Sequence, residues 1–186
     1  VNIPSLNPEK LEPVKDYMNI SENAGEIIGQ ISKGKIKSFE ITAYGELIKL
    51  DIEPLEVAIL KGALSSIFHD VNYVNAPFLA KQRGIEIKII KSEAPSSFTS
   101  LLKVKMTTDI ETNSVSVSLI AKNIARIVKL NDYDVIIKPN EHIFIVPHIN
   151  QVAMVAKVAN TLCEENINIG SMNVSQNIKG SDMSIM

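Results

Sequence analysis

The stretch that decides the fold, residues 101–137, reads LLKVKMTTDIETNSVSVSLIAKNIARIVKLNDYDVII. Apolar and polar residues alternate along it, most clearly at Val115, Val117 and Leu119, as they do in strands that bury one face. The pattern predicts four strands, at residues 101–108, 114–120, 124–130 and 135–137. Asn131-Asp132 favours a hairpin turn between the last two. The middle of the chain is therefore predicted to be β-sheet.

Helices are predicted on the amino-terminal side of this sheet. Asn7 can cap a helix that Pro8 begins, and Ser21 is placed to open a second helix that ends before Gly34. Pro54 begins a third helix, which carries too many apolar residues for an exposed element and is expected to be buried. Further elements are predicted at residues 36–44 (strand), 73–83 (helix ended at Gly84) and 85–90 (strand).

After the sheet, the polar stretch Lys138-Pro139-Asn140-Glu141 predicts a boundary between a first domain, residues 1–138, and a second, residues 139–186. The predicted elements of the second domain are a strand (142–146), a helix (151–165), a strand (167–174), a turn (177–180) and a strand (182–186). The order β-α-β-β opens a ferredoxin-like sandwich. The predicted fold class is therefore α+β, a mixed α/β domain followed by a truncated ferredoxin-like domain.

Composition excludes several classes of protein. The chain has 186 residues, 45% of them apolar, which supports a packed core. Lys and Arg number 19 against 21 Asp and Glu, so no basic field attracts nucleic acid. No apolar run is long enough for a membrane span, no signal peptide is visible, and a single cysteine, Cys163, reads as a packing thiol. A cytoplasmic protein is expected, and its ends read as those of a piece of a longer one.

Motifs for catalysis and cofactor binding are missing from the sequence. No G-x-G-x-x-G or G-x-x-x-x-G-K-[ST] turn occurs, so the chain is not expected to hold NAD by the usual route. His69, His142 and His148 lack the spacing of metal ligands, and no G-x-S-x-G elbow presents a nucleophile. We therefore predict no catalytic residue, no metal and no cofactor in this chain.

The strongest candidate for ligand binding is the trio His148, Asn150 and Asn168, which lies where a predicted strand meets the following helix and where the next strand starts. In a β-α-β unit these positions can converge at one sheet edge. Asn150 is placed to cap the helix, whose free N–H groups suit a carboxylate, and amide side chains suit a zwitterionic amino acid. The alternative is that Asn150 is only a helix cap and His148 a surface residue.

A second candidate is cationic. Lys81 and Arg83 end a predicted helix, Lys91 follows on the next strand and Arg126 lies on a later one, so that together they could bind a phosphate or carboxylate. The alternative is that these charged residues are simply solvated at the ends of their elements.

Several stretches of the sequence form a pattern that belongs together. The most specific is Asn75-Ala76-Pro77 followed by Ala80-Lys81-Gln82-Arg83-Gly84-Ile85. The others are Val1-Asn2-Ile3-Pro4, Ile36-Lys37-Ser38, Tyr44-Gly45-Glu46-Leu47, Leu60-Lys61-Gly62-Ala63-Leu64, Val71-Asn72-Tyr73-Val74, Arg126-Ile127-Val128 and Ile167-Asn168-Ile169. Together these stretches resemble the long form of D-3-phosphoglycerate dehydrogenase, collinearly over essentially the whole chain.

The resemblance implies that residues 1–138 are an intervening, allosteric substrate-binding domain and that residues 139–186 begin an ACT domain. In that family ACT modules pair side by side and bind serine at their interface, which places the serine contacts on His148, Asn150 and Asn168. It also implies anion binding, for which Lys81, Arg83 and Arg126 are the candidates. NAD and the catalytic residues would belong to upstream domains of the parent enzyme.

One departure from the family affects this expectation. Where the family commonly has Arg-Pro-Gly, this chain has Gln151-Val152-Ala153, and the added methyl group can obstruct a ligand that approaches the backbone closely. Two alternatives therefore stay open. The same modules resemble those of iron–sulfur L-serine dehydratases, and a purely structural assembly module without a ligand is the other.

Overall fold

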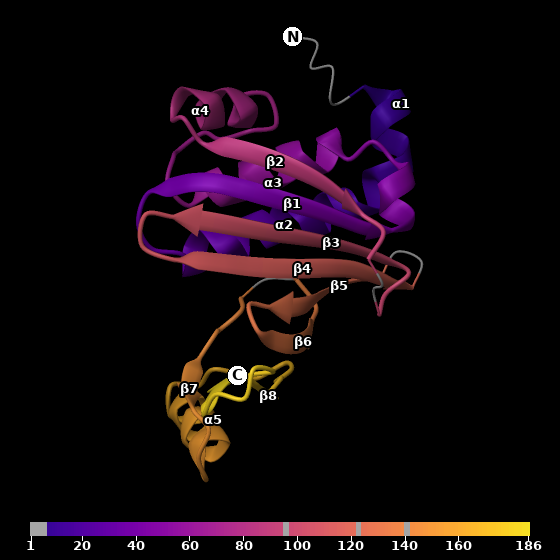
Figure 1. Cartoon of the computed structure of the whole chain (residues 1–186). Coiled ribbons are helices and arrows are strands. Elements are labelled where there is room, and N and C mark those ends of the chain that lie inside the picture. Colours follow the sequence, from indigo (N-terminus) through magenta and orange to yellow (C-terminus); the bar gives the residue numbers. More distant parts are fainter. Residues whose placement is uncertain (1–6, 95–96, 122–123, 140–141) are drawn as a thin grey trace.

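The computed structural model describes residues 7–94, 97–121, 124–139 and 142–186 (Figure 1). Its helical elements before residue 100 are α1 (Pro8–Leu11), η2 (Glu12–Val14), α2 (Lys15–Ile31), η3 (Glu46–Lys49), α3 (Glu53–Ser65) and α4 (Ala76–Gln82). The strands of the large sheet are β1 (Ile36–Gly45), β2 (Glu86–Ser92), β3 (Ser100–Thr108), β4 (Thr112–Ala121), β5 (Ile124–Leu130) and β6 (Tyr133–Ile137). The four strands predicted between residues 101 and 137 are confirmed.

These six strands form one sheet in the order β2-β1-β3-β4-β5-β6. β1 runs parallel to β2 and antiparallel to β3, and β3 to β6 form an antiparallel meander. The parallel pair is possible because α3 and α4 lie between β1 and β2 in sequence and return the chain to the same end of the sheet. In Figure 1, α2 and α3 lie behind the sheet, and its front face carries no helix.

The two faces of the large sheet differ most clearly along β3, where burial alternates from one residue to the next, whereas Val115 to Ser118 of β4 are all buried. Ile41, Val104 and Val115 lie opposite one another on β1, β3 and β4, and all three are fully buried under the helices. Lys103 and Ser116, which are also paired in register, lie on the other face, where Lys103 is half-buried and Ser116 is buried. The sheet therefore buries one face against α2 and α3, which makes a two-layer α/β arrangement.

α2 and α3 approach each other closely enough for backbone to touch backbone. A Cβ atom added at Gly62 of α3 would overlap the carbonyl oxygen of Glu22 and would lie 2.7 Å from the backbone nitrogen of Glu26, both in α2. A Cβ atom added at Gly25 would overlap the carbonyl oxygen of Ile59 in the same way. The predicted burial of α3 is confirmed, since most of its residues are buried.

Two predicted helix starts are corrected. Ser21 does not open a helix, because it lies inside α2, where its side chain is fully buried. The short helix α4 begins at Ala76, because Asn72 and Asn75 hold the preceding residues in a turn. The side-chain oxygen of Asn72 accepts from the backbone N–H of Asn75 at 3.0 Å, and that of Asn75 accepts from the backbone N–H of Asn72 at 2.8 Å. Asn7 and Pro8 start α1 as predicted.

The remaining elements form a second, smaller sheet. They are β7 (Pro147–Ile149), α5 (Met154–Glu164), β8 (Ser175–Gln176) and β9 (Met183–Ile185). The sheet order is β7-β9-β8 and both pairings are antiparallel, so β7 and β8 are parallel strands with β9 inserted between them. This is the split β-α-β arrangement with which a ferredoxin-like sandwich begins. The α+β fold class is confirmed.

Two strands of this second unit do not lie where they were predicted, since β7 and β8 follow the predicted ranges 142–146 and 167–174. Residues 142–146 and 167–174 are not strands, although Val146 and Met186 exchange both backbone hydrogen bonds, at 3.0 and 3.1 Å. The reason is the lack of partners, because the central strand β9 has three residues and pairs with only two residues of β8. Asn140 and Glu141 of the predicted boundary and the stretch Val1-Asn2-Ile3-Pro4 lie outside the described residues, so the domain division stays a prediction.

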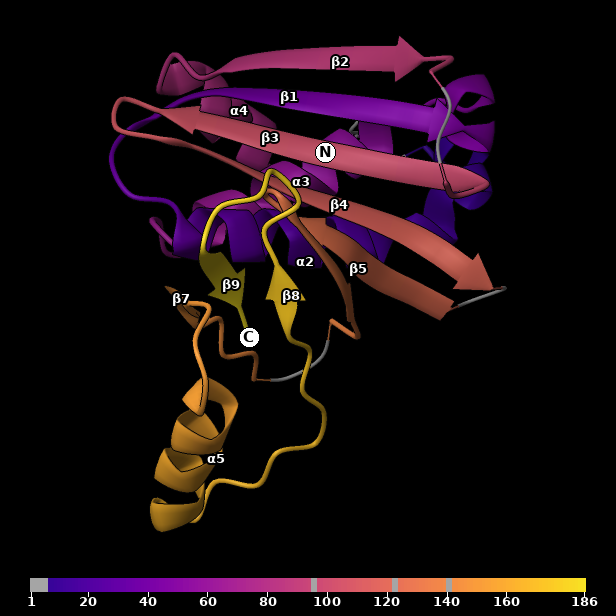
Figure 2. The same ribbon diagram turned by 60° about the horizontal axis from the view of Figure 1, so that its bottom comes forward.

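The turn between β8 and β9 contacts the large sheet (Figure 2). The Lys179 ammonium lies 2.9 Å from the carboxylate of Asp132, and the backbone N–H of Ile178 donates to the Asp132 carbonyl at 2.9 Å. The side-chain oxygen of Asn173 also accepts from the backbone of Ile136 at 3.2 Å. The smaller unit is therefore attached at the β5–β6 turn of the large sheet, where Asn131-Asp132 forms the predicted hairpin.

Glu56 gives this fold a pH dependence. It is half-buried on α3 and has no ion-pair partner among the described residues, and burial, followed by repulsion from Glu53, raises the pKa of its carboxyl group. The ionised form therefore destabilises the folded state. This penalty is absent below the unfolded pKa of about 4.5 and complete only above the raised folded pKa.

We expect Glu56→Gln to be more stable than the parent protein at pH 7, with a difference that shrinks as the pH falls toward 4.5. Urea unfolding at a series of pH values measures this. If the difference in the free energy of unfolding between the two proteins is the same at every pH, ionisation of Glu56 does not destabilise the fold.

No helix in the described ranges is both long enough and apolar enough to cross a membrane.

Candidate functional site

His148 and Asn150 lie on one side of the small sheet. His148 is in β7 opposite Ser184 of β9, and the backbone N–H of Asn150 continues the ladder by donating to the Asp182 carbonyl at 2.7 Å. Residues two apart on a strand face the same way. His148 is only 8% exposed, and its Nδ1 lies 3.0 Å from the Val146 carbonyl oxygen. With the proton on Nδ1 the ring donates to that carbonyl, which leaves Nε2 as an acceptor for a ligand.

The prediction that Asn150 caps the following helix is wrong. α5 begins at Met154, and the residue before it, Ala153, has φ 70° and ψ 1°, which is the left-handed conformation. The N-cap position of α5 is therefore Ala153. Asn150 lies three residues before this position and cannot cap the helix. No side chain caps α5. The N–H groups of its first turn are therefore available to an anion.

Ala153 is strained, because its left-handed conformation brings the Cβ atom close to the following carbonyl oxygen. The left-handed conformation costs an L-residue about 1–2 kcal/mol, and part of the gain from glycine is lost as about 0.5–1 kcal/mol of unfolded-chain entropy. We expect Ala153→Gly to raise the free energy of unfolding by roughly 0.5–1 kcal/mol. Thermal melting measures this, with Ala156→Gly inside α5 as the control that loses stability. If Ala153→Gly and Ala156→Gly lower the free energy of unfolding equally, the backbone of Ala153 is not strained.

Asn168 lies apart from the other two members of the trio. It follows α5 in the exposed segment 167–170 and lines a hollow of about 1280 Å³ that neither His148 nor Asn150 lines. Within the described part of the chain, no hydrogen bond joins Asn168 to His148 or Asn150. The structure therefore brings His148 and Asn150 together but does not bring Asn168 to them within one chain.

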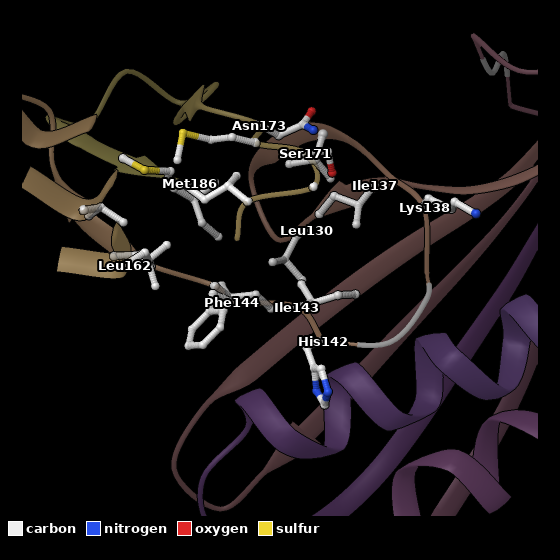
Figure 3. A pocket seen from close by; sticks show the side chains of 18 of the residues that line it. Leu130, Ile137, Lys138, His142, Ile143, Phe144, Leu162, Ser171, Asn173 and Met186 are labelled. Carbon is white, nitrogen blue, oxygen red and sulfur yellow. The ribbon is translucent and has the colours of Figure 1, made fainter. Parts of the chain in front are cut away.

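The hollow separates the large sheet from α5. Figure 3 shows side chains from both sides of it, Leu130 and Ile137 of the large sheet and Leu162 of α5, with Phe144 and Met186 between them. Most of its lining is apolar, so it offers packing surface. No three His, Cys, Asp or Glu side chains gather in the described ranges in a way that could hold a metal ion.

The cationic candidates lie in three places. Lys81 and Arg83 are at the end of α4, where the Arg83 guanidinium stacks 4.7 Å from the ring centre of Phe68. Lys91 on the neighbouring β2 donates to the Leu50 carbonyl at 2.7 Å. Arg126 is on β5, with three strands between it and β2, which is roughly 19 Å at the usual strand spacing. The structure therefore keeps Lys81 and Arg83 near each other but brings neither Lys91 nor Arg126 to them.

Cys163 is also placed differently from the prediction. It is exposed, because α5 lies on the outside of the small unit and has no buried residue. It is therefore not a packing thiol.

The stretches that carry the family resemblance hold the fold together. Glu22 of α2 forms an ion pair with Lys61 of α3 and accepts a hydrogen bond from the hydroxyl of Tyr73. The Lys61 ammonium also lies 4.5 Å from the centre of the Tyr73 ring. Burial, together with the contact to Glu22, raises the pKa of Tyr73 to about 12. This cluster joins the Asn72–Asn75 turn to both helices and is structural.

One residue of the small sheet has no signal in the sequence alone. Ser184 is fully buried opposite His148, and its hydroxyl group has no hydrogen-bond partner among the described residues. Only the register of β9 against β7 shows that the two side chains are neighbours.

Known proteins are similar to this chain over nearly all of its length. Residues 13–131 match the family described as the D-3-phosphoglycerate dehydrogenase intervening domain. A D-3-phosphoglycerate dehydrogenase of Synechocystis sp. is 30% identical over 98% of the chain, and one of Methanocaldococcus jannaschii is 32% identical over 98%. One of Bacillus subtilis is 28% identical over 100% of the chain.

The chain spans only part of each relative, 33%, 34% and 36% of their respective lengths. The family match covers α2, α3 and most of the large sheet, which is the layered unit described above. This chain belongs to the D-3-phosphoglycerate dehydrogenase family, through its intervening domain.

Proposed function

We propose that this chain is the regulatory part of an NAD-dependent D-3-phosphoglycerate dehydrogenase and that it binds L-serine as an effector. The family assignment supports the first half of this proposal. The sequence carries no dinucleotide-binding glycine motif, and in this proposal NAD and the catalytic residues belong to other domains of such an enzyme. The names of the relatives favour the dehydrogenase over an iron–sulfur serine dehydratase.

The observation that carries the effector site is the position of His148 and Asn150 on one side of β7, beside the uncapped start of α5. A carboxylate would accept hydrogen bonds from the free N–H groups of α5, aided by the helix dipole. The amide of Asn150 can donate to the ligand or accept from it, and His148 offers Nε2. A small zwitterionic amino acid fits these groups.

Asn168 enters the proposed site from a second copy. Within one chain it faces the hollow, so it reaches the ligand only if two small units pair. The surface around β7 and α5 supports such pairing, because Ile149 is 59% exposed, Val152 97% and Val155 43%. Pairing of this kind makes the effector site an interface, and serine would stabilise the paired arrangement.

The anion-binding candidates stay part of the proposal as two separate surfaces. Lys81 and Arg83 would serve a ligand at α4, and Arg126 one at β5. The stacking of Arg83 on Phe68 holds the first of these in place.

Calorimetric titration of L-serine into the purified protein tests the effector proposal. We expect saturable binding that Asn168→Ala weakens by about tenfold or more, the cost of one hydrogen bond to a charged group. Asn160→Ala is the matched control, since Asn160 is exposed on α5. Absence of binding to folded protein would overturn the proposal and leave the structural assembly module as the better interpretation.

A further inference from the structure

Two hydroxyl groups in the described part of the chain are buried without a hydrogen-bond partner, those of Ser21 and Ser184. Such groups are uncommon because each has lost its bonds to water, and they often mark a place where a water or a ligand binds. Ser21 is a buried residue of α2 and is not part of the small sheet. Ser184 lies in β9, next to the proposed effector site.

The register of the small sheet sets Ser184 and His148 side by side. Val146 exchanges both backbone hydrogen bonds with Met186, and Asn150 donates to Asp182, so His148 and Ser184 form the hydrogen-bonded pair between them. Side chains of directly opposite residues share a face, about 5 Å apart at Cβ. The Ser184 hydroxyl and the His148 ring therefore face the same side of the sheet.

Both residues have an acceptor left for a ligand. His148 is held by its Nδ1 contact to the Val146 carbonyl, and neither its Nε2 nor the Ser184 oxygen has a partner among the described residues. Exposed fractions of 8% for His148 and 0% for Ser184 show that bulk water does not solvate them freely. Two fixed, desolvated acceptors side by side suit a donor that carries several hydrogens, such as an ammonium group.

We propose that Ser184 is a ligand-contacting residue of the effector site and that it binds the α-ammonium group of an amino acid together with His148 Nε2. This inference rests on the proposed function. The carboxylate of the same ligand then lies at the start of α5, where the N–H groups have no side-chain cap. The small sheet thus binds the ammonium group and the start of α5 binds the carboxylate. Ser184 contributes to the selection of amino acids over hydroxy acids.

The test compares Ser184→Ala with Ser21→Ala, a matched control that removes the other unpartnered hydroxyl. Both variants are expected to fold, because each change removes a buried group that lacks a partner. The probes are L-serine and L-glycerate, which carries a hydroxyl group in place of the ammonium. Calorimetric titration gives the affinity, and thermal melting without ligand shows that each variant is folded. Ser184→Cys, of similar size but a weak hydrogen-bonder, serves as a second variant.

We expect Ser184→Ala and Ser184→Cys to weaken L-serine binding by about tenfold or more. The ratio of the affinity for L-serine to that for L-glycerate is expected to fall in these two variants. Ser21→Ala is expected to leave the affinity and the ratio unchanged. If the parent protein binds L-serine and the Ser184 variants bind it equally well, this inference fails and the proposed function stands. If the folded parent protein binds no amino acid, the proposed function fails and the inference fails with it.

Discussion

Gly62→Ala is expected to lower the free energy of unfolding by about 3 kcal/mol, at the upper end of the usual cost of overpacking a core. The added methyl group would overlap the carbonyl oxygen of Glu22 and press on the backbone of Glu26. A side chain can rotate away from such a contact, but the backbone of a helix cannot. The whole of α2 would have to move from α3, which would also open the contact at Gly25.

Thermal melting and urea unfolding measure this loss, which corresponds to a fall of roughly 6–12 °C in the melting temperature for a chain of this size. Gly170→Ala is the control, because a Cβ atom there meets nothing within 4 Å. If Gly62→Ala melts at the same temperature as Gly170→Ala, the backbones of α2 and α3 are not in close contact at Gly62.

Gly45→Ala is expected to lower the free energy of unfolding by a similar amount. Two separate causes contribute to this loss. Gly45 has φ 64° and ψ −134°, which alanine does not adopt readily, and an added Cβ atom would overlap the carbonyl oxygen of Thr99. Strain and overlap cost about 1–3 kcal/mol each. The change would also disturb the hydrogen bond from Glu46 N–H to that carbonyl, which is 3.1 Å long.

Gly84→Ala separates the two costs, because Gly84 also has a positive φ, 67°, but has open space around it. We expect Gly84→Ala to lose about 0.5–1 kcal/mol, the strain less the entropy that alanine removes from the unfolded chain, and Gly45→Ala to lose clearly more. Urea unfolding of the two variants under one set of conditions compares them. If both variants lose the same free energy of unfolding, the overlap between the added Cβ atom at Gly45 and the Thr99 carbonyl oxygen costs nothing.

Local sequence patterns sufficed for the elements that pack with regular alternation. The meander from Leu101 to Ile137 was predictable because Val115 and Val117 alternate with serines, and the buried α3 because its apolar residues surround the helix. The same reasoning failed at Ser21, which resembles a helix cap in sequence. Ser21 lies inside a helix because the packing of α2 on α3 extends through it.

The candidate site was less predictable, because it depends on contacts between distant residues. The shared side of His148 and Asn150 follows from their spacing on one strand. Ser184 becomes their neighbour only through the register of β9 on β7, for which the sequence has no signal. The separation of Arg126 from Lys81 likewise depends on the strand order, and charged residues alone do not determine that order.

The position of β1 inside the large sheet, between β2 and β3, bears on how the chain folds as it is synthesised. β1 is made before both of its neighbours, β2 and β3, and its pairing is complete only when residue 108 has been added. Until then a strand that carries Phe39 and Ile41 has open edges. The nascent chain is therefore open to edge-to-edge aggregation during this stage, which ends when β3 pairs with β1.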